Sequence, residues 1–281
     1  MKILALGDFH GKFPEKLKKL AKDVDFIIAL GDYADADEIR KIIFKSWINK
    51  RWYEVVGLKK AGEIEKKSFD SGLKVLKELN SLKKPIYVIF GNTDFYKSYL
   101  KSDSPVIMPG FYEDKIKKLK NLLILDKHKK KIQGIEFIGY GGYVDATDYI
   151  KHPVDRDKIR QKIRVKRYKQ DEKRFNKFLA KGKLTENAFF VFHWVPYGIF
   201  DKVLFKKSPM YKKHIGWEPY TKAIKKYQPK LVLCGHMHEY QGVKKMGKTL
   251  VINPGAAGHG KAAIIEINDE SKKIEKIRFV K

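Results

Sequence analysis

The stretch KILALGDFH at residues 2–10 sets a pattern that decides the fold: a short apolar run stops at Gly-Asp, and polar side chains follow at once. Four later apolar runs also stop at polar residues: 26–30 at Gly-Asp, 86–90 at Gly-Asn, 188–192 at His193 and 230–234 at Gly-His. Short apolar runs bounded by glycine or polar residues are typical of buried β-strands. Helical patterns separate several of these runs, which favours an α/β sheet with parallel pairings.

The later part of the chain predicts additional strands. Residues 122–125 and 135–139 resemble a hairpin across a lysine-rich turn, and residues 249–253 and 262–267 resemble a second hairpin. The tail at 274–280 adds another strand. This β-rich C-terminal half predicts two sheets packed together with helices outside.

Two long segments between the strands are expected to be helical. Residues 35–80 place apolar side chains at helical spacing, and residues 150–183 combine a helical pattern with a strongly basic composition. Neither segment is flanked by a linker, and no internal repeat is found. We therefore expect a single domain at 1–281 with helical insertions near 35–80 and 150–183.

The composition argues against a membrane-spanning, secreted or disulfide-bonded protein. The 281 residues are 43% hydrophobic, which is enough for a sizeable core. No run of about 18 apolar residues occurs, so we expect no membrane-spanning helix. Asp8 breaks the N-terminal apolar stretch too early for a signal peptide. The single cysteine, Cys234, excludes an internal disulfide and fits a reducing, cytoplasmic location.

The formal net charge of +28 has two explanations. One is a polyanionic partner such as RNA or DNA. The other, which charge alone favours, is a solvated lysine-rich surface typical of proteins from thermophiles.

The basic segment at 150–183 bears on the choice between a nucleic-acid partner and a solvated surface. Four arginines could form one helical stripe while Ile159 and Ile163 pack inward; they are Arg156, Arg160, Arg164 and Arg167. Such a stripe could track nucleic-acid phosphates. We favour a solvated helix face and keep nucleic acid as an alternative partner.

Five polar clusters directly follow the apolar runs, and the carboxyl ends of neighbouring parallel strands meet at one rim of a sheet. The clusters are Asp8-Phe9-His10, Gly31-Asp32, Gly91-Asn92-Thr93-Asp94, His193 and Gly235-His236-Met237-His238. Carboxylates, imidazoles and an amide oxygen together suit divalent ions such as Mn, Fe, Zn, Co or Ni. Since His236 and His238 are two residues apart, a turn must bring both inward.

The order D-x-H, GD, GN-x-D, H, GH-x-H over residues 8–238 resembles the calcineurin-like metallophosphoesterase family. A prokaryotic branch of it, the predicted phosphoesterases related to Icc-type cyclic-nucleotide phosphodiesterases, is similar at His193-Trp194-Val195-Pro196-Tyr197-Gly198 and at Asn253-Pro254-Gly255. The resemblance implies a four-layer α/β/β/α sandwich of two mixed sheets flanked by helices. It also implies hydrolysis of a phosphodiester or a small phosphomonoester by a metal-activated hydroxide.

The resemblance assigns ligands residue by residue. Asp8, His10 and His238 would hold the first ion, Asp32 would bridge both ions, and the second ion would be held by Asn92, His193 and His236. Two such ions can activate a water and neutralise phosphate oxygens during in-line attack. Singly, each side chain has an ordinary structural explanation, such as a helix cap or a turn residue.

One position departs from the family pattern. Many members have a histidine where this chain has Thr93, and that histidine is thought to protonate the leaving group; threonine cannot do so near neutral pH. His259, His214 and Tyr197 are candidate replacements. The full catalytic set is Asp32, Asn92, Thr93, Asp94 and His259, and the substrate-binding set is Tyr33, Asn92 and Tyr197.

The sequence is compatible with three functions. The favoured one is a metal-dependent phosphoesterase, with phosphodiesterase activity preferred. A nuclease or RNA-processing hydrolase would use the basic surface. A non-catalytic scaffold would be expected to lose ligands, and all of these ligand positions are filled. The sequence leaves the oligomeric state open, a homo-oligomer included.

Overall fold

The computed structural model describes residues 1–46, 50–97, 105–152, 158–182, 184–185, 187–208 and 210–281. The strands in this part of the chain are β1 (Lys2–Leu6), β2 (Phe26–Ala29), β3 (Ile86–Val88), β4 (Leu122–Ile124), β5 (Lys129–Ile132), β6 (Ile135–Tyr140), β7 (Phe189–Phe192), β8 (Leu231–Leu233), β9 (Gly242–Met246), β10 (Thr249–Asn253), β11 (Ala262–Ile267) and β12 (Ile274–Val280). The helices are α1 (Glu15–Leu20), α2 (Asp37–Ser46), α3 (Trp52–Val56), α4 (Leu58–Asn80), α5 (Tyr112–Ile116), α6 (Thr147–Lys151), α7 (Lys158–Leu179) and α8 (Glu218–Tyr227), with short 3₁₀ turns η1 (Ala21–Asp23) and η2 (Ala257–His259).

The strands form two mixed sheets of six. The first has the order β12-β11-β1-β2-β3-β4 and the second has the order β5-β6-β7-β8-β10-β9. In the first sheet β1 to β4 are parallel, β11 pairs antiparallel with β1, and β12 pairs antiparallel with β11. In the second, β6, β7, β8 and β10 are parallel and both edge strands are antiparallel.

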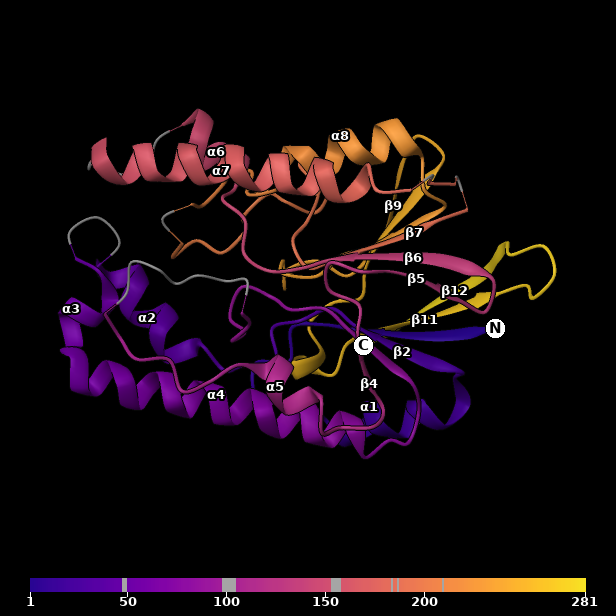
Figure 1. Ribbon diagram of the computed structural model, residues 1–281, viewed down its shortest axis with the longest axis horizontal. Coiled ribbons are helices and arrows are strands. Elements are labelled where there is room, and N and C mark those ends of the chain that lie inside the picture. Colours follow the sequence, from indigo (N-terminus) through magenta and orange to yellow (C-terminus); the bar gives the residue numbers. More distant parts are fainter. Residues whose placement is uncertain (47–49, 98–104, 153–157, 183, 186, 209) are drawn as a thin grey trace.

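The two sheets pack face to face between two layers of helices (Figure 1). Helices α1, α4 and α5 cover the first sheet, and α6, α7 and α8 cover the second. Strand β1 shows why the sequence allows this: Leu4 and Leu6 belong to the core under α4, whereas Ile3 and Ala5 belong to the core between the sheets. Side chains alternate along a strand, so a strand buried on both faces is apolar throughout. The expected four-layer α/β/β/α sandwich is confirmed.

Both hairpins expected from the sequence are wrong. Strand β4 pairs with β3 in the first sheet, and the partner of β6 is β5, which occupies the lysine-rich segment expected to be a turn. Strands β10 and β11 lie in different sheets. Apolar spacing indicates that a segment is buried and extended, but it does not choose the neighbouring strand. Lysines on an edge strand such as β5 instead discourage pairing with another chain. The strand expected at 274–280 is confirmed as β12.

Within the segment expected to be helical at 35–80, residues 47–49 lie outside the described part, and the described residues form α2, α3 and α4. Helix α4 begins directly after α3, and Gly57 separates them with a φ of 79°. Glycine adopts positive φ without the steric cost that a Cβ brings, so the chain can turn here between two helices. Among the described residues, no helix combines the length and apolarity needed to cross a membrane.

The expected orientation of α7 is wrong. Ile159 and Ile163 are 70% and 39% exposed, and Arg164 and Arg167 turn inward to a fully buried carboxylate, Asp145. The apolar contacts of the helix come later, from Tyr168, Phe175 and Leu179. The need to pair a buried charge outweighs the burial of two isoleucines near the helix start. Arg156 of the expected stripe lies outside the described residues.

Candidate metal centre

The five polar clusters meet where strands of both sheets end, as expected. Asp8, Asp32 and Asn92 follow β1, β2 and β3, while His193 and His236 follow β7 and β8. Asp8, His10, Asp32 and His236 all have positive φ, between 47° and 66°. Non-glycine residues rarely adopt this conformation, which costs energy and concentrates at functional sites. The left-handed turn at His236 supplies the inward turn that the spacing to His238 requires.

Glycine makes room for the central carboxylate. A Cβ at Gly91 would lie 2.1 Å from Oδ1 of Asp32, so any larger residue would displace that side chain. This close approach explains why a glycine precedes Asn92 in the loop after β3.

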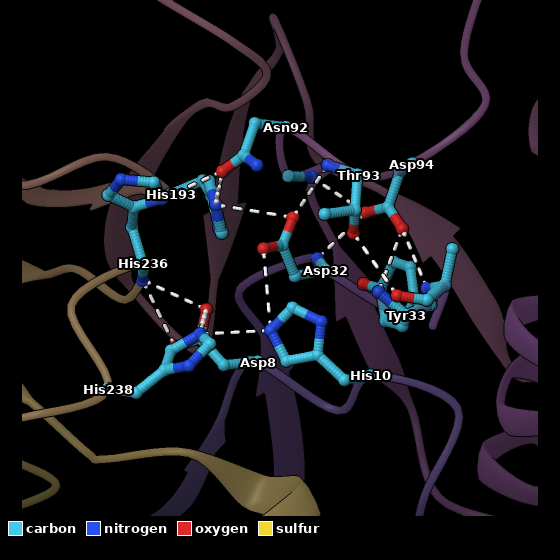
Figure 2. Close-up of polar contacts among 12 residues, drawn as sticks. Asp8, His10, Asp32, Tyr33, Asn92, Thr93, Asp94, His193, His236 and His238 are labelled. Carbon is cyan, nitrogen blue, oxygen red and sulfur yellow. Dashed lines mark hydrogen bonds and ion pairs between the residues drawn. The ribbon is translucent and has the colours of Figure 1, made fainter. Parts of the chain in front are cut away.

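The first group of side chains comprises Asp8, His10 and His238, with one oxygen of Asp32 beside them (Figure 2). Nε2 of His10 lies 2.9 Å from Nε2 of His238. Oδ1 of Asp8 is 3.5 Å from Nε2 of His238, and Oδ2 of Asp32 is 3.7 Å from Nε2 of His10. These atoms converge on one point.

The second group comprises Asn92, His193 and His236. Oδ1 of Asn92 lies 3.0 Å from Nε2 of His193 and 2.7 Å from Nδ1 of His236. The other oxygen of Asp32, Oδ1, is 3.4 Å from Nε2 of His193. Asp32 therefore directs one carboxylate oxygen toward each group, as Figure 2 shows.

Hydrogen bonding indicates that this centre is built for cations. Nδ1 of His193 must donate to the carbonyl oxygen of Leu30, 2.8 Å away, because a carbonyl only accepts. In the neutral ring, Nε2 then directs a lone pair at the amide oxygen of Asn92. Two acceptors at that distance repel each other unless a positive ion lies between them. The residues present thus fit a divalent ion by donor type and by orientation.

Electrostatics keep the rings available as ligands. Burial lowers the pKa of His10 to about 4 and that of His236 to about 3, so both are neutral at physiological pH. Burial pushes the pKa of Asp32 upward, but the nearby His193 and His10 overcome this and hold it well below its usual range. Metal ligands must be deprotonated, and these shifts favour the deprotonated forms.

Asp94 and Thr93 support Asp32 from behind. The fully buried Asp94 carboxylate accepts backbone N–H groups of Asp32, Tyr33, Ala34 and Gly91 at 2.7–3.3 Å. Burial raises its pKa to about 7. The N–H of Thr93 donates to Oδ1 of Asp32, and its hydroxyl donates to the carbonyl of Ala34. Asp94 was expected to be catalytic, and the structure shows its carboxylate bound to the backbone around Asp32.

Tyr33 is wrongly assigned as a substrate-binding residue. Its side chain is fully buried, its ring stacks on Phe9, and its hydroxyl donates to the carbonyls of Ala29 and Ile89. A residue that completes the core and caps two strand ends cannot contact a substrate.

The three candidate acids lie in different places. His259 lines a hollow together with Asp8, His10 and His238. The hydroxyl of Tyr197 donates to Asp148, and the ring of His214 pairs with Asp201. Neither Tyr197 nor His214 lines that hollow. His259 is held in position by the turn before it, because the N–H of Gly258 donates to the carbonyl of Asp8.

Sequence reasoning did not give a role to two residues beside the centre. Arg40, on α2, lines the same hollow as His259. Trp194 covers the ring of His236. Trp194 directly follows a ligand candidate and so carried a signal, whereas Arg40 lies in a helical segment without any motif.

Known protein families and structures resemble this chain in sequence and in fold. A sequence model described as calcineurin-like phosphoesterase matches residues 1–240. An uncharacterized protein of Methanocaldococcus jannaschii, MJ1162, is 23% identical over 256 residues, covering 90% of this chain and 88% of that protein.

Solved structures with similar folds cover nearly the whole chain. One crystal structure aligns with a TM-score of 0.65 and 20% identity over 99% of this chain and 98% of its own. The TT1561 protein of Thermus thermophilus aligns with a TM-score of 0.49 and 16% identity over 98% and 96%. The family match spans most of the sequence and includes every ligand candidate. The chain belongs to the calcineurin-like phosphoesterase family.

Proposed function

We propose that the protein is a two-metal phosphoesterase whose ligands are divided between two ions by Asp32. Asp8, His10 and His238 would hold the first ion. Asn92, His193 and His236 would hold the second, and Asp32 would be shared between the two. The observation that supports this most is that the two oxygens of Asp32 point toward different ligand groups, with Oδ2 near His10 and Oδ1 near His193.

The ions, when bound, would supply an activated water and neutralise the phosphate oxygens. The chain itself contributes orientation. The N–H of Thr93 and the Asp94 network hold Asp32, and the Leu30 carbonyl fixes the ring of His193. Because these partners are buried, the ligands are arranged before any ion arrives, which favours tight binding.

The mixture of ligand types bears on the identity of the ions. Four imidazoles, two carboxylates and one amide oxygen suit manganese, iron, zinc, cobalt or nickel better than magnesium or calcium. Manganese is included in this proposal because carboxylate and amide oxygens serve it well. Elemental analysis of protein purified without chelators or an affinity metal would distinguish these ions.

The absence of a histidine at position 93 bears on the substrate. Thr93 has its hydroxyl bonded to the Ala34 carbonyl and offers no acid to a leaving group. General acid catalysis contributes about 10²–10⁴-fold to such reactions. We propose phosphodiester hydrolysis as the activity in vitro, with leaving groups that depart without a proton.

The basic surface gives less support to a nuclease than the sequence did. Two of the four stripe arginines, Arg164 and Arg167, are engaged with Asp145. They also lie over aromatic rings, Arg164 over Tyr149 and Arg167 over Tyr143. Nucleic acid therefore stays an alternative substrate that a test should include.

The decisive experiment is an activity screen of protein reconstituted with each candidate ion. The panel should contain a nitrophenyl phosphodiester, a nitrophenyl phosphomonoester and short oligonucleotides, with a chelator-treated sample as control. We expect metal-dependent hydrolysis of the diester. Full activity after exhaustive chelation, with metal loss verified, would contradict the proposal.

A further inference from the structure

The hollow beside the first ligand group carries side chains that the metal site does not need. Its volume is about 150 Å³, and Asp8, His10 and His238 form one side of it. Lys12, Arg40 and His259 also line it. A single water needs only about 10–15 Å³ in such a measure, so the hollow has room for a larger polar group.

These three side chains come from separate parts of the fold. Lys12 lies in the loop after β1, Arg40 lies on α2, and His259 ends the short turn η2. The turn is fixed to the centre by backbone hydrogen bonds from Ala257 to Gly7 and from Gly258 to Asp8. Groups that converge from three segments onto one hollow form a site that the fold maintains.

Arg40 lines the hollow together with its ion-pair partner, Asp37. Its Nη1 pairs with Oδ1 of Asp37 at 3.1 Å, but both side chains are well exposed and such a pair contributes little. Arg40 lines the same hollow as His10, a ligand candidate of the first group. A bound divalent ion at the first group would repel the guanidinium. An anion between them would remove that repulsion and use the arginine fork.

Thr93 provides an independent observation about the leaving group. This chain places no acid at position 93, and the threonine hydroxyl is bonded to a carbonyl. The favoured leaving group is therefore one that departs with its negative charge. A phosphate has a low pKa as a leaving group, and it carries the charge that Arg40 and Lys12 can bind.

We propose that the substrate contains a phosphoanhydride bond and that Arg40 binds the departing phosphate in this hollow. The inference rests on the proposed phosphoesterase function. The oxygen of a water forms the new bond to phosphorus, and the bridging P–O bond breaks. The departing phosphate keeps the electron pair, and the proton lost by the water passes to solvent. Arg40 and Lys12 compensate the charge that develops on the departing group.

The test compares two substrates that differ by one phosphate. Metal-loaded protein is assayed with diadenosine diphosphate and with adenylyl-adenosine, which joins the same nucleosides through one phosphodiester. We expect kcat/KM for the diphosphate to be at least about 100-fold higher, within the range that leaving-group protonation supplies. Arg40→Gln should reduce that ratio at least about tenfold. Lys41→Gln, which removes the next, exposed charge on α2, should leave it unchanged.

Binding supplies a readout that does not depend on turnover. Calorimetry with methylenediphosphonate should show about 10- to 100-fold weaker binding to metal-loaded Arg40→Gln, as expected for loss of a charge-assisted hydrogen bond. Lys12→Gln should act in the same direction, and Lys41→Gln should bind as the native protein does. Equal affinity of the Arg40 and Lys41 variants would overturn the proposal.

Failure of the phosphoanhydride inference and failure of the proposed phosphoesterase function would give different results. Hydrolysis of bis(p-nitrophenyl) phosphate without any preference for the diphosphate over adenylyl-adenosine would overturn the phosphoanhydride inference alone. No hydrolysis of any probe by protein shown to contain two ions would overturn the proposed function instead. In that case the diphosphonate titrations would still decide whether Arg40 binds a phosphate.

Discussion

The indole ring of Trp194 stacks on the imidazole of His236, with ring centroids 3.6 Å apart and planes 20° from parallel. Trp194 is itself buried and held by a hydrogen bond from Nε1 to the carbonyl of Ile215. Tyr143 contacts its ring edge-on. A buried ring held by this hydrogen bond and by Tyr143 restrains the plane of a proposed metal ligand, so we expect Trp194 to act as a positioning residue.

Replacing that ring should weaken the second ion more than the first. In Trp194→Phe the smaller ring leaves His236 freer to rotate and leaves the Ile215 carbonyl without its donor. Loss of an outer partner of a metal ligand typically costs about 10–100-fold in affinity. Stepwise metal titration should show one weakened site. Trp217→Phe is a matched control, since Trp217 is also buried in this core but does not stack on a ligand candidate. Equal loss of metal affinity in both variants would indicate that Trp194 acts only through ordinary core packing.

Asp32→Asn should affect both ions. The substitution keeps the size of the side chain but removes the negative charge and turns one ligand oxygen into a hydrogen-bond donor. We expect metal content to fall from two ions per chain to one or fewer, and hydrolysis to be nearly abolished. Elemental analysis after gel filtration measures the first effect. Asp114→Asn, an exposed carboxylate on α5, serves as the control. Retention of two tightly bound ions would argue against the bridge.

Asp94→Asn should disturb the same carboxylate indirectly. The native side chain accepts four backbone N–H groups, and an asparagine can accept with only one of its two polar atoms. The unpaired donors should cost about 2–4 kcal/mol of unfolding free energy, with a loss of metal affinity. Asp126→Asn is the control, because Asp126 is also buried and accepts the N–H of Gly141. Similar destabilisation without weaker metal binding in both variants would show that Asp94 supports the fold alone.

The sequence predicted the ligand candidates because they follow apolar runs at strand ends. Asp8 and His193 lie far apart in the chain, but both come directly after buried strands, and strand ends converge. The left-handed backbone at His236 could be inferred only as a need for some turn. Its φ of 66° depends on the hydrogen bonds that its N–H makes to both Asp8 oxygens, which no local pattern encodes.

The parts that could not be predicted depend on partners distant in sequence. The orientation of α7 was mistaken because Ile159 and Ile163 are apolar, while the buried Asp145 that attracts the arginines lies outside the helix. The hairpins were mistaken because strand spacing does not tell which sheet a strand joins. Arg40 was missed because only the tertiary fold brings α2 to the hollow.

Arg164 and Arg167 on α7 should stabilise the fold through their contacts with Asp145. Replacing both Arg164 and Arg167 by Gln leaves the Asp145 carboxylate buried without its cationic partners. Breaking a buried pair costs about 3–5 kcal/mol, and denaturant unfolding should show a loss of this size. Arg174→Gln removes a pair with Asp171 in which the arginine is 67% exposed, so the loss should be smaller, about 1 kcal/mol.

The same variants test the nucleic-acid alternative. Each phosphate contact contributes roughly one unit to the slope of log affinity against log salt. We expect oligonucleotide affinity and its salt slope to be unchanged in the Arg164 and Arg167 variants, measured where they remain folded. A salt slope reduced by about two units would instead indicate that Arg164 and Arg167 contact nucleic-acid phosphates.

Thr93 stands where the family pattern has a histidine that could protonate the leaving group. The leaving oxygen needs a proton when its pKa is high, as in an alkyl or ribose alcohol, and needs none when it is a nitrophenolate or a phosphate. The native rate should therefore fall steeply as leaving-group pKa rises across a series of aryl and alkyl diesters. Thr93→His should flatten that dependence if the ring reaches the leaving oxygen, with metal content verified in both proteins.

His259 is the candidate acid that could explain a shallow dependence of the native rate on leaving-group pKa. It lines the hollow with His10 and His238, so it is placed near the ligand groups, whereas Tyr197 and His214 are paired with Asp148 and Asp201. If another acid already serves, the native slope will be shallow and His259→Ala will steepen it. If instead the native slope is steep and His259→Ala leaves it unchanged, no acid acts there, and His259 is left to bind the anion beside Arg40. His259→Ala should then weaken methylenediphosphonate binding without altering the leaving-group slope, and a single variant measured both ways separates proton donation from charge binding.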